Sequence, residues 1–274
     1  MTLATTAAPR LPKLPLRATI RLAYATFFDG FRDVLRISSA WLVACALLGA
    51  MSNWLKLNQT VDTLRYQMVP RTPITSWLVD GAFFIAFLLA GVSIAVAWHR
   101  LLILHEAPPP SGSNITTGRV WRYLGTALLI TLVILVPTLV AIAPVFLLFW
   151  GWLAIVVIGV YIAALLVGGR LSIMLPAQAV DDRTMTLSAA WDITRGNSWR
   201  LFWGYIACTI PTAVLAQLAV MLLVGVPDQQ SLLDGSFAIK ATVLSVVFTA
   251  YYLLTLPIAI GFLSHAYRHF TGRA

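Results

Sequence analysis

Hydrophobic positions in this sequence form six long, almost uncharged runs, and polar positions gather between them. A membrane-spanning helix needs roughly 20 mostly apolar residues, because each unpaired backbone group in hydrocarbon costs several kcal/mol. Six segments meet this requirement, at about residues 39–56, 77–99, 123–144, 147–170, 200–224 and 238–265. The third and fourth nearly fuse, since no charge occurs from Leu124 to Val167, so a very short turn is expected near Pro144–Trp150.

Arginine marks where these runs begin and end. Three of the runs open with similar segments, VLRISSAWLVAC, VWRYLGTALLIT and SWRLFWGYIACT. The runs that follow them close with AWHRLLIL, GGRLSIML and AYRHFTG. The third pair of segments is the weakest match. The arginines concerned are Arg36, Arg122 and Arg200 in the openers and Arg100, Arg170 and Arg268 in the closers. We therefore predict an all-α polytopic membrane protein with six transmembrane helices as three hairpins, at about 37–105, 119–176 and 197–270.

The segment before the first run has the period of an amphipathic helix. Between Leu16 and Leu35 one face is aromatic and aliphatic and the other is charged: Ile20, Tyr24, Phe27, Phe28, Phe31 and Leu35 against Arg17, Arg21, Arg32 and Asp33. Such a helix suits the membrane interface. Residues 1–36 are thus expected to form a cytoplasmic tail and an interfacial anchor, with partner binding as the alternative, and residues 37–274 a single six-helix domain.

A second interfacial helix is expected between the fourth and fifth runs. Thr186 can cap a short elbow helix at about 184–197, Gly196 can end it, and Ser198 can cap the helix that follows. Trp191 and Trp199 suit the headgroup zone, where tryptophan is enriched. The N-terminus lacks the pattern of a cleaved signal peptide, because no apolar stretch precedes Trp41.

Charge supports this topology. Only 11% of the 274 residues are charged, against about 25% in soluble domains. On the expected topology only Lys56, Arg65, Arg71 and Lys240, out of 19 basic residues, lie on the face opposite the termini. The positive-inside rule then places both termini in the cytoplasm. The net charge of +9 is accounted for by this topology and by the anionic lipid headgroups that the basic face would contact. A nucleic-acid partner is therefore not expected.

The segment RLSIMLPAQAVDDRTMTLSAAWDITRGNSWRLF, from Arg170 to Phe202, resembles one found in poorly characterised bacterial polytopic proteins. It is similar to the membrane domain attached to some glycerophosphoryl diester phosphodiesterases. The resemblance implies a noncatalytic membrane domain of the bacterial inner membrane. The catalytic part of those enzymes is a separate α/β barrel of about 250 residues, for which this chain has no room. His99-Arg100 followed by Glu106 is therefore interpreted as a coincidental likeness to their active site.

Few residues suggest chemistry. The pairs His99/His105 and His265/His269 lie near the inner ends of two helices, but two ligands do not make a metal site, and interfacial histidines are the simpler interpretation. Cys45 and Cys208 stand in apolar runs and are expected to be buried thiols. Nucleotide, hydrolase and zinc-protease motifs are absent from the sequence, so no catalytic residue, cofactor or metal is expected.

Two functional hypotheses follow, with a third behind them. The first is a nonenzymatic module that binds lipid or an unknown protein partner as a scaffold or regulator. The second is a small transporter for an apolar or amphiphilic solute, suggested by proline kinks at Pro137, Pro211 and Pro257. The third, a membrane-embedded lipid enzyme, would require four inner side chains to converge: Asp181, Asp182, Asp192 and His265.

Two sets of residues distinguish these hypotheses. A polar cavity around Gln217, lined by Tyr251 or Tyr252, would favour transport, whereas a dry core would favour the module. Several arginines are expected at one depth near the inner surface, where their side chains can form forked hydrogen bonds with phosphate. We therefore predict a ring of arginines around anionic headgroups. The alternative is that these arginines only determine the topology of the chain. The candidate lipid contacts are Arg36, Arg100, Arg122, Arg170 and Arg200.

Overall fold

The computed structural model describes residues 13–66, 74–148, 153–224 and 236–272, and within these ranges the chain is helical without β-strands. The helices are α1 (Leu16–Asp29), α2 (Phe31–Tyr66), α3 (Ile74–Leu104), α4 (Gly118–Leu148), α5 (Leu153–Leu171), α6 (Met174–Ala179), α7 (Leu187–Ile193), α8 (Ser198–Val224) and α10 (Ser236–Thr271). The predicted all-α polytopic class is confirmed.

Six helices are long and apolar enough to cross a membrane, as predicted. Their candidate spans are Phe31–Lys56, Ile74–Leu104, Gly118–Ala143, Ile155–Ala179, Ser198–Ala219 and Ile239–Thr271. Most begin earlier or end later than the hydrophobic pattern indicated, because the helices continue through the arginines at their ends. The turn expected near Pro144–Trp150 falls largely outside the described residues.

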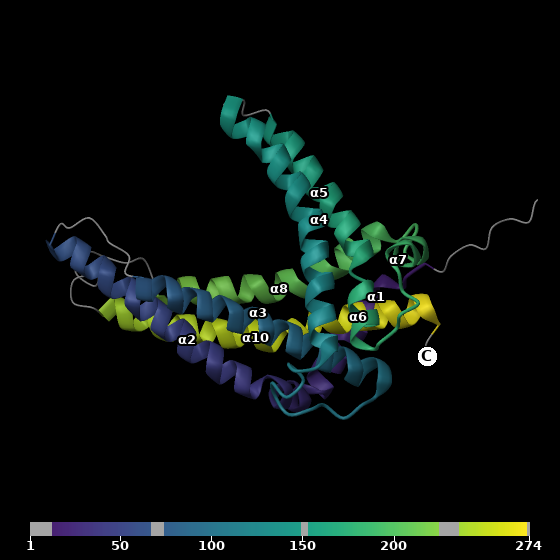
Figure 1. Ribbon diagram of the computed structural model, residues 1–274, viewed down its shortest axis with the longest axis horizontal. Helices are drawn as coiled ribbons and strands as arrows, with labels where there is room; N and C mark the ends of the chain where they lie inside the picture. The colour runs from purple at the N-terminus through teal and green to yellow at the C-terminus, as the bar shows by residue number, and fades with distance from the viewer. Residues whose placement is uncertain (1–12, 67–73, 149–152, 225–235, 273–274) are drawn as a thin grey trace, which may run out of the picture.

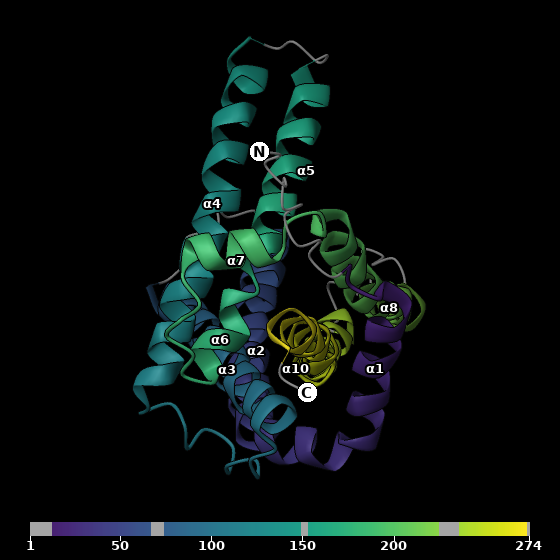
Figure 2. The same cartoon turned by 90° about the vertical axis from the view of Figure 1, so that its right-hand side faces the viewer.

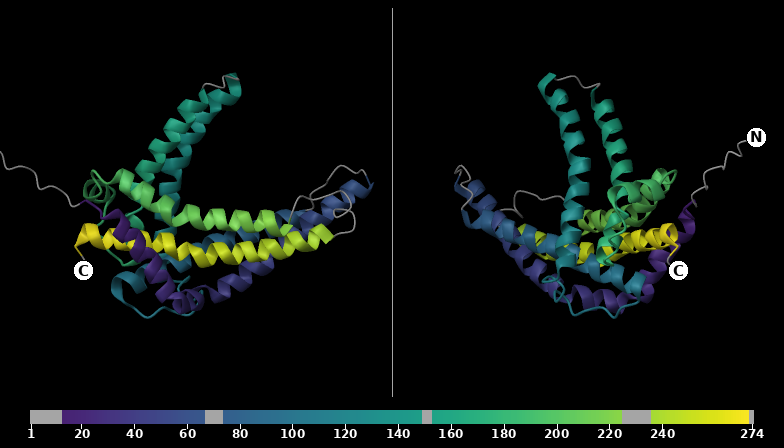
Figure 3. Two further views of the ribbon diagram at one scale, coloured as in Figure 1. Left: turned by 180° about the vertical axis from the view of Figure 1, so that it is seen from behind. Right: turned by 45° about the vertical axis from the view of Figure 1, so that its right-hand side comes forward.

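The three hairpins do not form one parallel bundle (Figure 1). The long helix α10 is central and packs against α1, α2, α3 and α8, as the end-on view in Figure 2 shows. The hairpin of α4 and α5 leans away from this body, and the views in Figure 3 show it as a separate arm. The arm joins the body at its base, where α5 packs on α8, and α4 on α3 and α6. The protein is therefore V-shaped.

Glycines permit close helix contacts at the base of the V. A Cβ atom at Gly168 of α5 would lie 2.4 Å from the Cδ1 atom of Ile134 in α4, whereas one at Gly169 would meet nothing within 4 Å. At Gly204 of α8 a Cβ atom would lie 2.0 Å from the ring of Phe262 in α10. Of the Gly168–Gly169 pair, only Gly168 therefore makes a tight helix contact.

The amphipathic segment is shorter than expected and packs differently. Its helix, α1, ends at Asp29, and α2 begins at Phe31, so the boundary placed after residue 36 falls inside α2. Glycine is required at position 30, because a Cβ atom there would lie 2.9 Å from the Trp98 ring. The buried residues of α1 are Thr19, Ala23 and Phe27, and the helix packs against α8 and α10. The expected aromatic face does not pack as one surface, because Phe27 is buried whereas Phe28 is 68% exposed.

The connection from α5 to α8 contains the elbow helix α7. Its N-cap is Thr186, whose hydroxyl accepts a hydrogen bond from the backbone N–H of Ala189 at 3.2 Å. Gly196 has φ +78°, a left-handed conformation that glycine adopts without strain. Ser198 is already helical, and the Oδ1 atom of Asn197 before it accepts from the backbone N–H of Leu14 at 2.9 Å. This bond ties the start of α8 to the segment before α1.

Candidate functional site

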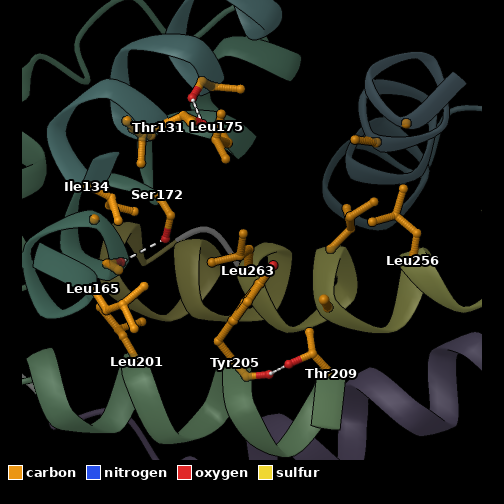
Figure 4. A pocket seen from close by; sticks show the side chains of 18 of the residues that line it. Thr131, Ile134, Leu165, Ser172, Leu175, Leu201, Tyr205, Thr209, Leu256 and Leu263 are labelled. Carbon is orange, nitrogen blue, oxygen red and sulfur yellow. Dashed lines mark hydrogen bonds between the residues drawn. The ribbon is translucent and has the colours of Figure 1, made fainter. Parts of the chain in front are cut away.

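A cavity of about 670 Å³ lies at the base of the V, between the α4–α5 arm and helices α3, α8 and α10. Figure 4 shows side chains from these helices around the open space. Each of the five helices contributes apolar residues to the wall, among them Ala95, Ile130, Leu165, Leu201 and Leu263. Among the described residues that line this space, none is charged. The cavity is thus suited to hydrocarbon.

The cavity wall also contains six hydroxyl groups, and three of them are satisfied within their own helices. Thr131 donates to the carbonyl of Ala127 at 2.9 Å, Ser172 to Gly169 at 2.7 Å, and Thr209 to Tyr205 at 2.9 Å. The other three belong to Tyr123, Tyr161 and Tyr205. Tyr123 is 5% exposed, whereas Tyr161 and Tyr205 are about half exposed.

Tyr123 belongs to a buried polar cluster behind the cavity wall. The His99 side chain is fully buried, its Nδ1 atom lies 2.8 Å from the Ser264 hydroxyl, and its Nε2 atom lies 3.3 Å from the Tyr123 hydroxyl. The interpretation of His99 as an interfacial residue is therefore wrong. Its partner Ser264 lies 165 residues away in the chain, so no local pattern could have shown this contact.

The other histidines do not assemble a metal site. His105 is exposed with φ 54°, and His265 lies 3.4 Å from the Thr26 hydroxyl. Within the part of the chain that the structure describes, no group of three His, Cys, Asp or Glu side chains gathers closely enough to hold a metal ion. Cys45 and Cys208 are buried free thiols, as expected.

The polar cavity predicted around Gln217 corresponds to a second space of about 600 Å³ near the outer end of the body. Gln217 and Tyr252 line it, together with Lys56, whose Nζ atom lies 3.0 Å from an Asp80 oxygen. Tyr251 instead donates to the carbonyl of Thr212 at 2.8 Å. Gln217 lies in the second half of α8, which continues beyond it to Val224.

One side chain is shared by the two spaces. Phe87 of α3 lines both the apolar cavity and the outer polar one. Its ring centroid lies 5.9 Å from that of Phe83, which faces the outer space only. The Phe87 side chain therefore borders both spaces.

At the inner end, three arginines converge on Asp181, in the loop after α6. Arg119 donates to its Oδ2 atom at 2.5 Å, Arg122 donates to Oδ1, and an Nη1 atom of Arg100 lies 3.5 Å from Oδ2. Arg100 also donates to both oxygens of Glu106, at 2.8 and 2.5 Å. Because Arg119 and Arg122 come from α4 and Arg100 from α3, this cluster joins the arm to the body.

The arginine cluster changes the ionisation of Asp181. Partial burial alone would raise the pKa of the carboxyl group, since it disfavours the charged form. The hydrogen bond from Arg119 and the charges of Arg119, Arg122 and Arg100 outweigh burial, so the pKa lies below its usual value. Asp181 is therefore ionised at neutral pH and neutralises part of the surrounding positive charge.

The remaining candidate lipid contacts are placed separately. Arg170 donates to the Thr194 hydroxyl at 3.1 Å and stacks 3.4 Å from the centre of the Trp191 ring. Arg200 donates to the carbonyl of Leu14 at 2.5 Å. Arg36 is exposed. Four of the five arginines thus have protein partners. An anionic headgroup that binds one of these arginines would have to share its side chain with that protein partner.

The carboxylates required for a lipid enzyme have different environments. Asp182 is buried, accepts from the Thr184 hydroxyl at 2.6 Å, and receives a hydrogen bond from the Tyr267 hydroxyl. Asp181 points into the arginine cluster, and Asp192 is exposed on α7. These groups hold the inner connection in place, and Asp182 ties it to the end of α10.

No family model, curated protein or solved structure matches this chain. The chemistry of the site rests on its own residues. An uncharged cavity with a buried hydroxyl–imidazole cluster can enclose an apolar molecule and offer it hydrogen bonds.

Proposed function

We propose that this six-helix membrane protein is a nonenzymatic module that binds a lipid, with the lipid chain in the apolar cavity. The observation that carries the proposal is the cavity itself: about 670 Å³, uncharged among its described lining residues, and bordered by five helices that are long and apolar enough to span a membrane. This volume falls within the range of roughly 300–1,000 Å³ that small-molecule sites occupy.

The lining of the cavity favours a lipid chain as occupant. Its wall comes from helices that are long and apolar enough to span a membrane, and its described residues are apolar apart from six hydroxyl-bearing side chains. Water entering it would meet few groups to hydrogen-bond. In the bilayer, association depends on packing, and the concave wall offers a lipid chain more contacts than bulk lipid does.

The inner surface supports a role at the cytoplasmic side of a bacterial inner membrane. On the expected topology all basic residues except Lys56, Arg65, Arg71 and Lys240 lie on the same side of the membrane as the termini, which is the positive-inside arrangement. Arg36 is exposed there, and Arg122 is 44% exposed despite its bond to Asp181. Anionic headgroups can therefore approach this surface while a lipid chain fills the cavity.

Transport of an amphiphilic solute is a second candidate, favoured by the outer polar space. That space contains Gln217 and Tyr252, and Phe87 borders both it and the apolar cavity. Transport would require a solute to pass this aromatic side chain. Lipid binding requires only the inner cavity, so we place it first.

Filling the cavity tests the proposal. Gly91 lines it, and a Cβ atom there would meet only a Leu256 methyl group at an ordinary 3.7 Å, so Gly91→Leu adds a side chain without a backbone clash. Gly91→Leu is expected to lower the lipid retained after detergent washing by about tenfold, measured by native mass spectrometry. Gly81→Leu, on the same helix with nothing within 4 Å of its Cβ position, is the matched control and should retain lipid normally. Equal retention by both variants would contradict the proposal.

A further inference from the structure

The apolar cavity reaches the level of the inner arginines. In three of its helices an arginine stands directly beside a residue of the cavity wall. These neighbours are Arg122 and Tyr123 in α4, Arg170 and Gly169 in α5, and Arg200 and Leu201 in α8. Neighbouring residues of a helix are separated by only about 1.5 Å along its axis. The inner end of the cavity and the three arginines are therefore at nearly the same height.

From this level the cavity extends over about the length of a lipid chain in one leaflet. The residues of α4 that line it lie on one helical face, at Tyr123, Ala127, Ile130, Thr131 and Ile134. From the first to the last of them the helix rises by roughly 17 Å. The hydrocarbon of one leaflet is about 15 Å deep, half of a core of about 30 Å. An acyl chain that begins at the arginines therefore fits the cavity in length.

The protein leaves these three arginines with positive charge to spare. Among the described residues, Arg170 and Arg200 form no ion pair, and Arg122 shares the carboxylate of Asp181 with two other arginines. A guanidinium group has five N–H donors, and the hydrogen bonds described above use one or two of them in each side chain. An anionic group can therefore bind the remaining donors while the protein contacts stay in place.

We infer that the lipid in the cavity is an anionic phospholipid, with one acyl chain between the helices and its phosphate at Arg122, Arg170 and Arg200. The inference rests on the proposed lipid binding and names the chemical class of the ligand. Guanidinium groups bind phosphate oxygens with forked, charge-assisted hydrogen bonds. A zwitterionic headgroup brings the same phosphate together with a cation that the arginines repel, so a lipid of net negative charge is preferred.

Two lipids with the same chains and different headgroup charge test this preference. Native mass spectrometry of the full chain, in micelles with equal mole fractions of dioleoyl phosphatidylglycerol and dioleoyl phosphatidylcholine, is expected to show about tenfold higher occupancy by phosphatidylglycerol. Arg122→Gln and Arg200→Gln should each reduce this preference about threefold, the effect of one partly exposed charge pair. Both variants should retain phosphatidylcholine as the wild type does, which shows that the cavity is still formed.

Arg36→Gln is the matched control, because Arg36 is exposed on α2, a helix that contributes no described residue to the cavity wall. This variant should keep the full preference, and an equal loss there would assign the effect to the basic surface and overturn the inference. Equal occupancy by both lipids in the wild-type protein would also overturn it and leave lipid binding standing. If neither lipid is retained, lipid binding itself fails.

Two further measurements test whether one molecule provides both the head and the chain. Gly91→Leu, which fills the cavity, should lower the retention of both lipids. A loss of phosphatidylcholine alone would place the anionic headgroup at a separate site and contradict the inference. Millimolar inorganic phosphate should leave bound phosphatidylglycerol in place, whereas its displacement would assign the arginines to a soluble phosphate and overturn the inference.

Discussion

Gly204→Ala is expected to destabilise the protein by about 2–3 kcal/mol, the cost of overpacking a rigid contact. The new Cβ atom would lie 2.0 Å from the Cζ atom and 2.3 Å from the Cε2 atom of the Phe262 ring. Phe262 is fully buried in α10, so its ring cannot move aside without displacing neighbours. The helices α8 and α10 would have to separate, and a lowered thermal midpoint in detergent would show it.

Gly125→Ala is the control for this prediction. Gly125 lies in α4, and a Cβ atom there would meet nothing within 4 Å. Alanine is the better helix former by roughly 0.5–1 kcal/mol, so this variant should be at least as stable as the wild type. Equal midpoints for the two variants would mean that α8 and α10 do not cross as closely as described.

Asp181→Asn is expected to loosen the attachment of the α4–α5 arm. The amide removes the only negative charge that Arg119 and Arg122 contact among the described residues, while Arg100 keeps Glu106. Because these side chains are partly exposed, solvent screens the effect, and we expect a loss of about 1–2 kcal/mol. A lowered thermal midpoint at pH 7 measures it, with Asp192→Asn on α7 as the control.

Acid should reproduce this loss in the wild-type protein. The pKa of Asp181 is depressed in the folded state, so the carboxylate contributes its stability above its unfolded pKa and loses it as the pH falls through the folded value. The difference in midpoint between wild type and Asp181→Asn should therefore be full at neutral pH and shrink below the usual aspartate range. A difference that is constant with pH would assign the effect to something other than charge.

The architecture could be predicted because hydropathy is local. The six runs, their arginine boundaries and the Thr186 cap are each contained in short windows, and the membrane requires internally bonded helices. The close approach of Trp98 to Gly30 could not be predicted, because the two residues are distant in sequence.

The cavity and its buried cluster could not be predicted from these patterns. Close helix contacts depend on which residues are small where helices cross, such as Gly168 between α4 and α5 and Gly204 between α8 and α10, and hydropathy does not report crossing angles. The His99–Ser264–Tyr123 contacts join three helices whose order of packing is not encoded locally. The only signals were a histidine beside Arg100 and a tyrosine beside Arg122, both of which also suit a membrane interface.

The most direct test of lipid binding is photocrosslinking in nanodiscs with a diazirine-bearing long-chain alcohol, with labelled residues identified by mass spectrometry. Exposed positions on α4 such as Leu132 and Leu139 report bulk lipid, and Ala127 and Leu256 report the cavity. We predict that cavity labelling saturates at low mole fraction and is competed by unlabelled alcohol, while labelling at Leu132 and Leu139 rises linearly. Labelling that rises linearly at all four positions would contradict a lipid site in the cavity.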